Sequence, residues 1–207
     1  EPYVKEGKDV LVISFSSGLS GTYESYLSAA RELADKDPAR VCVVDSLCAS
    51  LGQGLFVDYI VKKADSGASL DETVAYAEEL KGHMCHFFTV DDLFHLKRGG
   101  RVSGATAVVG KMLNIKPVLH VDDAGHLIAI GKAMGRKKSL AALVDKMTEL
   151  NELDKNDPVF ISHGDCESDV EYLTGLIKSR FGLRTFYVNM IGSVSGTHSG
   201  AGTVALY

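Results

Sequence analysis

The sequence predicts an α/β protein of two lobes, with parallel strands in the first lobe and a mixed α+β second lobe. Over the first eighty residues, short apolar runs alternate with helical stretches, which favours parallel strands joined by right-handed crossovers. Further along, two apolar runs flank an Asp-Ala-Gly turn at residues 123–125, which is typical of a β-hairpin. The composition, 45% hydrophobic and 24% charged over 207 residues, is that of an ordinary globular protein.

In the first lobe, two short apolar runs predict strands that are buried on both faces. A Ser/Gly-rich loop follows the first run and leads into an amphipathic helix. A capping box at Ser69 and Glu72 opens a later helix. The expected strands cover residues 10–15 and 41–45, and the expected helices cover residues 23–35, 47–65 and 70–82.

In the second lobe, a Gly-Gly pair after residue 98 ends a short helix, and a capping pattern at residues 168–171 opens a longer one. The expected strands cover residues 84–90, 117–122, 126–130, 159–162 and 185–191, and the expected helices cover residues 91–99, 105–113, 136–150 and 168–180. Because the pattern changes from parallel to mixed near residues 83–90, we divide the chain into lobes at 1–83 and 84–207.

Several classes of protein are excluded. The chain has 22 Lys+Arg against 27 Asp+Glu, which argues against a nucleic-acid platform. No apolar run approaches the roughly 18 residues that span a bilayer. The four cysteines form no Cys-x-x-Cys pair and no disulfide framework, so the cytoplasm is the default compartment. The stretch from His83 to His86 lacks further ligands at zinc spacing, so we expect no metal and no cofactor.

The loop at residues 16–22 is the first candidate site. It places four hydroxyls and several backbone N–H groups between a buried strand and a helix N-terminus, which favours an anion. The alternative is that Ser and Thr merely cap the helix. A serine-hydrolase elbow needs Gly-x-Ser-x-Gly, and Gly18-Leu-Ser20 is followed directly by Gly21 and Thr22.

Two further segments could bind an anion. His198 lies among glycines and hydroxyls at residues 196–202, where it can donate hydrogen bonds to a carboxylate or phosphate. The alternative is a glycine-rich turn with an incidental histidine. Arg101 follows a Gly-Gly break and can fork to the same kind of ligand, whereas Lys97 and Arg98 fit a solvated helix end.

Five segments, in order along the whole chain, resemble the DegV family of bacterial fatty-acid-binding proteins. They are residues 15–23, 44–52, 90–104, 116–119 and 196–202. The resemblance implies a Rossmann-like parallel-sheet lobe, a smaller α+β lobe, and a tunnel between them for a long-chain fatty acid. It also implies a lipid-binding carrier, the acyl-binding subunit of a fatty-acid kinase used in phospholipid synthesis. Such a carrier is no enzyme and presents the carboxylate to a separate ATP-dependent kinase.

Carried over by position, the resemblance implies that Ser17 and His198 hydrogen-bond the carboxylate and that Arg101 contacts the kinase. The residues that would complete the ligand site are Ser16, Gly18, Thr197 and Gly200. Family members carry a further N-terminal segment with a first strand, so we expect the first lobe to be incomplete at its N-terminus. Two alternatives remain: a hydrolase or transferase with Ser17 as nucleophile and His198 as base, or a module that binds phosphate or nucleotides.

Overall fold

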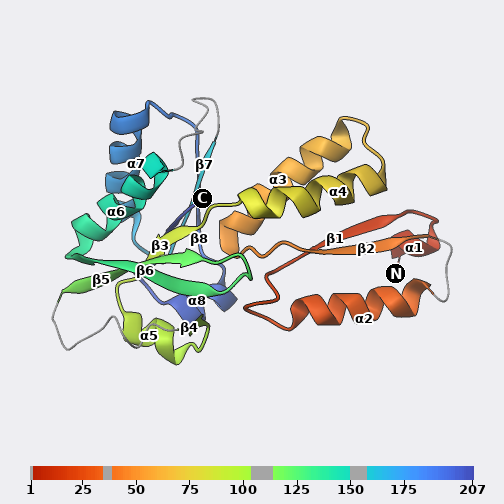
Figure 1. The fold of residues 1–207 in the computed structure, drawn as a ribbon, viewed down its shortest axis with the longest axis horizontal. Helices are drawn as coiled ribbons and strands as arrows, with labels where there is room; N and C mark the ends of the chain where they lie inside the picture. The colour runs from red at the N-terminus through yellow and green to blue at the C-terminus, as the bar shows by residue number, and fades with distance from the viewer. Residues whose placement is uncertain (1, 35–38, 104–113, 150–157) are drawn as a thin grey trace. The chain divides into compact units, whose positions relative to one another are not determined.

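A computed structural model describes residues 2–34, 39–103, 114–149 and 158–207, which form two compact units (Figure 1). The first unit consists of Glu1–Ala49, Gln53–Met84 and Asp123–Gly125, and the second of Ser50–Gly52, Cys85–Asp122 and His126–Tyr207. The α/β class and the two-lobed organisation are therefore confirmed. The second unit contains the greater part of the given residues.

A two-stranded parallel sheet forms the centre of the first unit, with Val10 paired to Val41 and Ser14 to Asp45. This unit contains α1 (Pro2–Lys5), β1 (Val10–Ser14), α2 (Thr22–Ala34), β2 (Val41–Asp45), most of α3 (Ser50–Asp65), α4 (Leu70–Leu80) and the short helix η1 (Lys81–His83). Helix α2 covers one face of the sheet, and α3 and α4 cover the other (Figure 1). The predicted capping box of α4 is present, with Ser69 and Glu72 bonded reciprocally.

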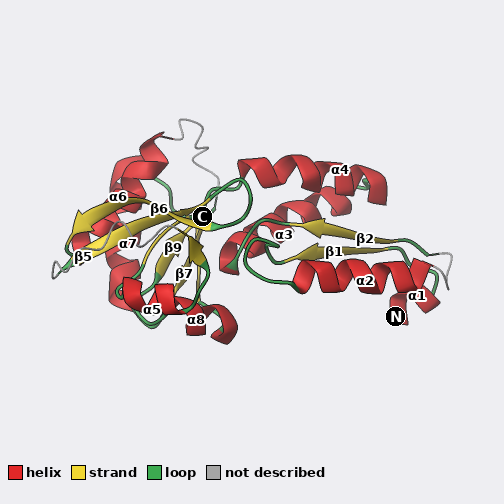
Figure 2. Ribbon diagram, turned by 60° about the horizontal axis from the view of Figure 1, so that its bottom comes forward, coloured by secondary structure: helices red, strands yellow, loops and turns green. Residues whose placement is uncertain are grey.

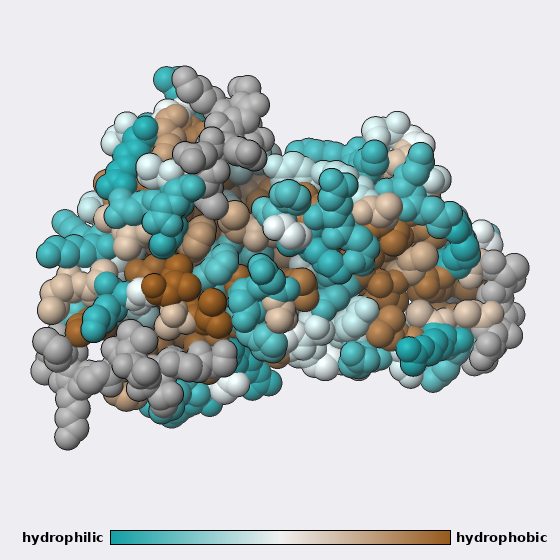
Figure 3. All heavy atoms as spheres, in the orientation of Figure 1, coloured by the Kyte–Doolittle hydropathy of each residue, from teal (hydrophilic) through white to brown (hydrophobic). Residues whose placement is uncertain are grey.

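The two strands of this sheet are not buried on both faces as predicted. The first four residues of β1 and the first three of β2 are partly exposed. Among the described residues, each strand has one strand neighbour, so each has a free edge. Figure 3 accordingly shows hydrophobic side chains at the surface over β1 and β2.

A seven-stranded mixed sheet forms the centre of the second unit, in the order β4-β6-β5-β3-β9-β7-β8. Figure 2 labels β5, β6, β7 and β9 of this sheet. Its strands are β3 (Phe87–Thr89), β4 (Val102–Ser103), β5 (Ile115–Val121), β6 (Leu127–Met134), β7 (Val159–His163), β8 (Phe186–Met190) and β9 (Val204–Leu206). Its helices are α5 (Leu93–Arg98), α6 (Arg136–Glu149), α7 (Glu167–Phe181) and α8 (Ser193–Ser199). The antiparallel β5–β6 pair confirms the predicted hairpin.

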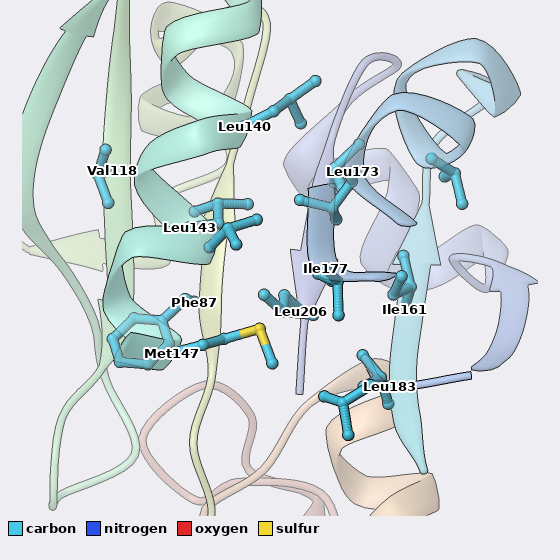
Figure 4. Packing of buried hydrophobic residues seen from close by; sticks show 14 residues of the cluster. Phe87, Val118, Leu140, Leu143, Met147, Ile161, Leu173, Ile177, Leu183 and Leu206 are labelled. Carbon is cyan, nitrogen blue, oxygen red and sulfur yellow. The ribbon is translucent and has the colours of Figure 1, made fainter. Parts of the chain in front are cut away.

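The main core of the second unit lies between the sheet and helices α6 and α7. Figure 4 shows Leu143 of α6 and Ile177 of α7 directed into the same cluster as Phe87, Ile161 and Leu206 of the sheet. A second cluster on the other face packs Leu93 and Leu96 of α5 against the sheet. No helix in the described segments has the length and apolarity that crossing a bilayer requires.

Three expectations for the second lobe change. The helix expected at residues 105–113 lies outside the described residues. Helix α7 begins at Glu167 after Cys166, not at a side-chain cap on Ser168. Residues 193–199 form a helix, so the segment 196–202, for which a glycine-rich turn was one alternative, is helical over its first four residues; contacts with α5 outweigh the poor helix propensity of Gly, Ser and Thr.

We predict that Gly52→Ala destabilises the protein. A methyl group at Gly52 would lie 2.2 Å from His86 Nε2 and 2.6 Å from Tyr207 Cδ1, where neither ring can yield without disturbing the other. Overpacking of this kind lowers the free energy of unfolding by about 1–3 kcal/mol, measurable by urea denaturation. The matched control is Gly175→Ala in α7, where the added methyl meets open space and raises the free energy of unfolding by up to about 1 kcal/mol. Equal stability of the two variants would contradict the prediction.

Candidate functional site

Ser17 presents an exposed hydroxyl directly after β1. Its backbone N–H donates to both oxygens of Asp45, at 3.1 and 3.4 Å, at the end of the neighbouring parallel strand. Asp45 also accepts from the N–H of Leu47, at 3.1 Å. Within the part of the chain that the structure describes, no group bonds to Ser17 Oγ, so this hydroxyl is available to a ligand while its main chain is fixed.

Ser16 has a different role from its neighbour. Its side chain is fully buried, its Oγ donates to the carbonyl of Gly125 at 2.8 Å, and it accepts from the N–H of Gly18 at 3.2 Å. Its backbone N–H donates to the carbonyl of Cys48 at 3.0 Å. Ser16 Oγ therefore both donates and accepts a hydrogen bond within the protein, and these bonds stabilise the loop.

The other hydroxyls of the loop support the start of α2. Ser20 Oγ and Thr22 Oγ1 are 2.7 Å apart, and the N–H of Thr22 donates to Ser20 Oγ at 3.3 Å. Each hydroxyl thus has its own place: Ser20 and Thr22 bond to each other at the start of α2, and Ser16 stabilises the loop. The Ser17 hydroxyl is exposed.

Cys48, whose carbonyl holds Ser16, has a thiol that resists ionisation. Burial raises the pKa of the Cys48 thiol to about 12, against a weaker opposing effect of a hydrogen bond with the Ser46 side chain. In an unfolded chain the thiol ionises near a pKa of about 8.5. As the pH rises, the thiol therefore ionises first in the unfolded chain, which stabilises that state. The free energy of unfolding is unaffected by Cys48 below about pH 8.5 and falls as the pH rises from there toward 12.

We predict that Cys48→Ala reduces this alkaline loss of stability. One pKa unit corresponds to about 1.4 kcal/mol, so ionisation of the unfolded thiol costs wild type roughly 2 kcal/mol of unfolding free energy at pH 10. The measurement is urea denaturation of wild type and variant at pH 8 and pH 10. The same fall in both proteins would show that another group causes it.

His198 lies on α8 with one ring nitrogen already engaged. Nδ1 is 3.1 Å from the carbonyl oxygen of Gly99, and because a carbonyl only accepts, Nδ1 carries the proton. Nε2 then accepts when the imidazole is neutral and donates only when the ring is an imidazolium. A hydrogen bond between Nε2 and a ligand carboxyl group therefore requires a proton on one of the two, on the imidazole or on the carboxyl group. The Thr197 hydroxyl donates a hydrogen bond within α8 to the Ser193 carbonyl, at 2.8 Å.

Arg101 shares the carbonyl that orients His198. Its Nη1 donates to the Gly99 oxygen at 2.9 Å, and the residue is exposed. Gly99 has no room for a side chain, because a Cβ would lie 2.8 Å from the His198 carbonyl oxygen. Gly100 has φ +73°, a conformation that favours glycine. The Gly-Gly pair thus brings the end of α5 onto α8 and presents Arg101.

The loop after α8 is fixed by Arg136, the first residue of α6. Arg136 donates from Nη2 to the Gly202 carbonyl at 2.5 Å and from Nε to Asp169 at 2.8 Å. Gly202 also donates to the Gly164 carbonyl at 2.7 Å. A basic group at a helix start, such as Arg136 beside Lys137 and Lys138, is usually solvated, but here the fold brings the Arg136 side chain to the loop at Gly200–Gly202.

The predicted site residues fall into two groups. The structure brings Ser16, Ser17 and Gly18 together in the first unit, and it brings Arg101, Thr197, His198 and Gly200 together around α5 and α8 in the second.

Three carboxylates that could orient a catalytic histidine, those of Asp45, Asp91 and Asp92, have other bonds. Asp45 holds main-chain N–H groups, Asp91 pairs with Lys116, and Asp92 caps α5. In the described segments, no three His, Cys, Asp or Glu side chains are grouped to hold a metal ion.

Comparison with known proteins identifies the family. The family model described as "Uncharacterised protein, DegV family" matches residues 1–207. A DegV domain-containing protein of Clostridium perfringens is 45% identical over all of this chain and 72% of its own length. The structure of a DegV family protein from Thermus thermophilus, described by its fatty-acid binding, is 35% identical with a TM-score of 0.84, over 96% of this chain and 70% of that one.

The same fold occurs in the Streptococcus pneumoniae Fatty Acid Kinase (Fak) B3 protein loaded with linoleic acid. It has a TM-score of 0.85 at 22% identity, over 99% of this chain and 73% of that one, a likeness that concerns the fold alone. The family model matches the whole chain, along which the resemblance runs. This chain therefore belongs to the DegV family.

Proposed function

We propose that the protein binds a long-chain fatty acid, with Ser17 and His198 as hydrogen-bond donors to its carboxylate. The observation that carries this proposal is the exposed, unbonded hydroxyl of Ser17 on a main chain fixed by Asp45. His198 supports it, because its Nδ1 proton is held by Gly99 and Nε2 remains for the ligand. Fatty-acid binding by the Thermus thermophilus relative supports the same ligand class.

The acyl tail supplies most of the binding free energy in this proposal. Each buried CH₂ group contributes about 0.8 kcal/mol, so a long chain is held mainly by apolar surface. The hydroxyl and imidazole then offset the desolvation of the carboxylate and fix its position. Recognition of the acid and retention of the tail are thus separable properties.

We propose further that the protein is a carrier, not an enzyme, and that it presents the carboxylate to an ATP-dependent kinase that contacts Arg101. The exposure of Arg101 at the end of α5 suits such a contact. A hydrolase with Ser17 and His198 would need a carboxylate at His198 Nδ1, which instead bonds the Gly99 carbonyl. The proposal includes no cofactor and no metal.

Native mass spectrometry of the purified chain, followed by lipid extraction, tests this proposal. We expect a noncovalent mass shift that disappears on denaturation and a free fatty acid in the extract. A mass that survives denaturation on Ser17 would indicate a covalent acyl-enzyme. Thermal stabilisation by nucleotides but not by palmitic acid would favour the nucleotide-binding alternative.

A further inference from the structure

We propose that the turn Asp123–Gly125, between β5 and β6, is a positioning element for Ser17. It holds the loop of residues 16–18 so that the Ser17 hydroxyl is presented in one place to the carboxylate. This inference rests on the proposed function, and it assigns a role to a turn that the sequence predicted only as the end of a hairpin.

The first support is a buried hydrogen bond across a long stretch of sequence. Ser16 Oγ donates to the Gly125 carbonyl at 2.8 Å, over a separation of 109 residues. The same oxygen accepts from the N–H of Gly18. One fully buried hydroxyl thus ties the turn to the residues on both sides of Ser17.

The second support is the close approach of two backbones. A Cβ on Gly18 would lie 2.7 Å from the Ala124 carbonyl oxygen and 2.8 Å from the carbonyl carbon and oxygen of Gly125. A Cβ on Gly125 would lie 2.2 Å from Ser16 Oγ and 3.2 Å from Leu47 Cδ2. Neither Gly18 nor Gly125 has room for a methyl group, so the turn and the loop fit each other closely.

The third support is what remains free. Asp45 fixes the peptide N–H of Ser17, and the turn fixes Ser16 and Gly18, which leaves rotation about χ1 as the main freedom of the Ser17 side chain. A side chain of this kind samples three staggered positions. Little order then needs to be created on binding, which strengthens recognition of the ligand head group.

The test separates head-group recognition from overall damage by using palmitic acid and hexadecanol, which share a tail. We expect Gly125→Ala to weaken binding of the acid by about tenfold and of the alcohol by less than about twofold, because only the acid needs a positioned Ser17. The matched control is Gly67→Ala, which also lies at positive φ (+92°) but meets open space. We expect the control to bind both ligands as wild type does.

Rescue provides the second readout. In Ser16→Ala/Gly125→Ala, the oxygen that the new methyl would strike is gone, so the acid affinity of the double variant should rise from that of Gly125→Ala toward that of Ser16→Ala alone. If Gly125→Ala does not fold, Ser16→Ala removes the bond without adding an atom, and we expect it to weaken acid binding by at least about threefold with little change for the alcohol.

Equal losses for acid and alcohol in Gly125→Ala, or unchanged affinity for both, would overturn the positioning role while leaving the proposed function intact. A wild-type protein that binds neither ligand would overturn the proposed function itself and the positioning role with it. The two failures are therefore distinguishable in the same titrations.

Discussion

Replacing His198 with alanine is expected to reduce acyl-phosphate formation by at least about a hundredfold while weakening fatty-acid binding by about tenfold or less. The tail supplies most of the affinity, at about 0.8 kcal/mol per CH₂, so loss of one head-group bond leaves the ligand bound. Transfer of a phosphoryl group depends more steeply on geometry, since small misplacement of a reacting group costs about a hundredfold. The measurements are ligand titration and a radiolabelled ATP assay with a bacterial fatty-acid kinase.

His198→Asn and His198→Gln separate the two nitrogens of the ring. The asparagine amide can replace Nδ1 at the Gly99 carbonyl but does not reach the place of Nε2, whereas glutamine can reach that place. We expect glutamine to retain more acyl-phosphate formation than asparagine. Equal loss of binding and of phosphorylation in His198→Ala would refute a role in positioning the carboxylate.

Asp45→Ala should lower the free energy of unfolding by about 2–4 kcal/mol, because it removes the buried carboxylate that accepts from the N–H groups of Ser17 and Leu47. Hydrogen bonds to charged groups contribute about 1.5–3 kcal/mol each. The strained backbone at Leu47, with φ +55°, depends on the same carboxylate. Urea denaturation provides the measurement.

Asp45→Asn is the matched control, since its amide oxygen still accepts while its charge is gone. We expect a loss of roughly 1 kcal/mol for this variant. Palmitic acid titration adds a functional readout, because Asp45→Ala also releases the main chain of Ser17. Stability of Asp45→Ala equal to that of Asp45→Asn would mean that the acceptor is not what matters at this position.

Local signals predicted those parts of the fold that are decided locally. The capping box at Ser69 and Glu72 fixes the start of α4, and the Asp-Ala-Gly turn fixes the hairpin. The loop that carries Ser17 was predicted between a strand at residues 10–15 and a helix at 23–35, and the structure places it between β1, which ends at Ser14, and α2, which begins at Thr22. These features depend on residues within a few positions of one another, which a sequence displays directly.

Features that depend on distant residues escaped prediction. Strand β9 lies between β3 and β7, and nothing near Val204 indicates that position. Helix α8 forms from Gly, Ser and Thr because His95 of α5 bonds the Thr197 carbonyl, at 2.8 Å. The role of Arg136 likewise requires Gly202 as its partner. Propensity and periodicity carry no information about such pairings.

The hydrogen bond between Ser16 and the Gly125 carbonyl also has a consequence for the order in which parts of the chain fold. The N-terminus of a growing chain leaves the ribosome first. The elements β1, α2 and β2 are therefore synthesised well before the turn Asp123–Gly125, which contacts the loop between β1 and α2. Contacts of such high sequence separation form late, because loop-closure entropy is lost before they stabilise the chain. The hydroxyl of Ser17 thus reaches its final surroundings only after the hairpin has been made, and a nascent chain that ends before residue 125 displays this serine on an unsupported loop.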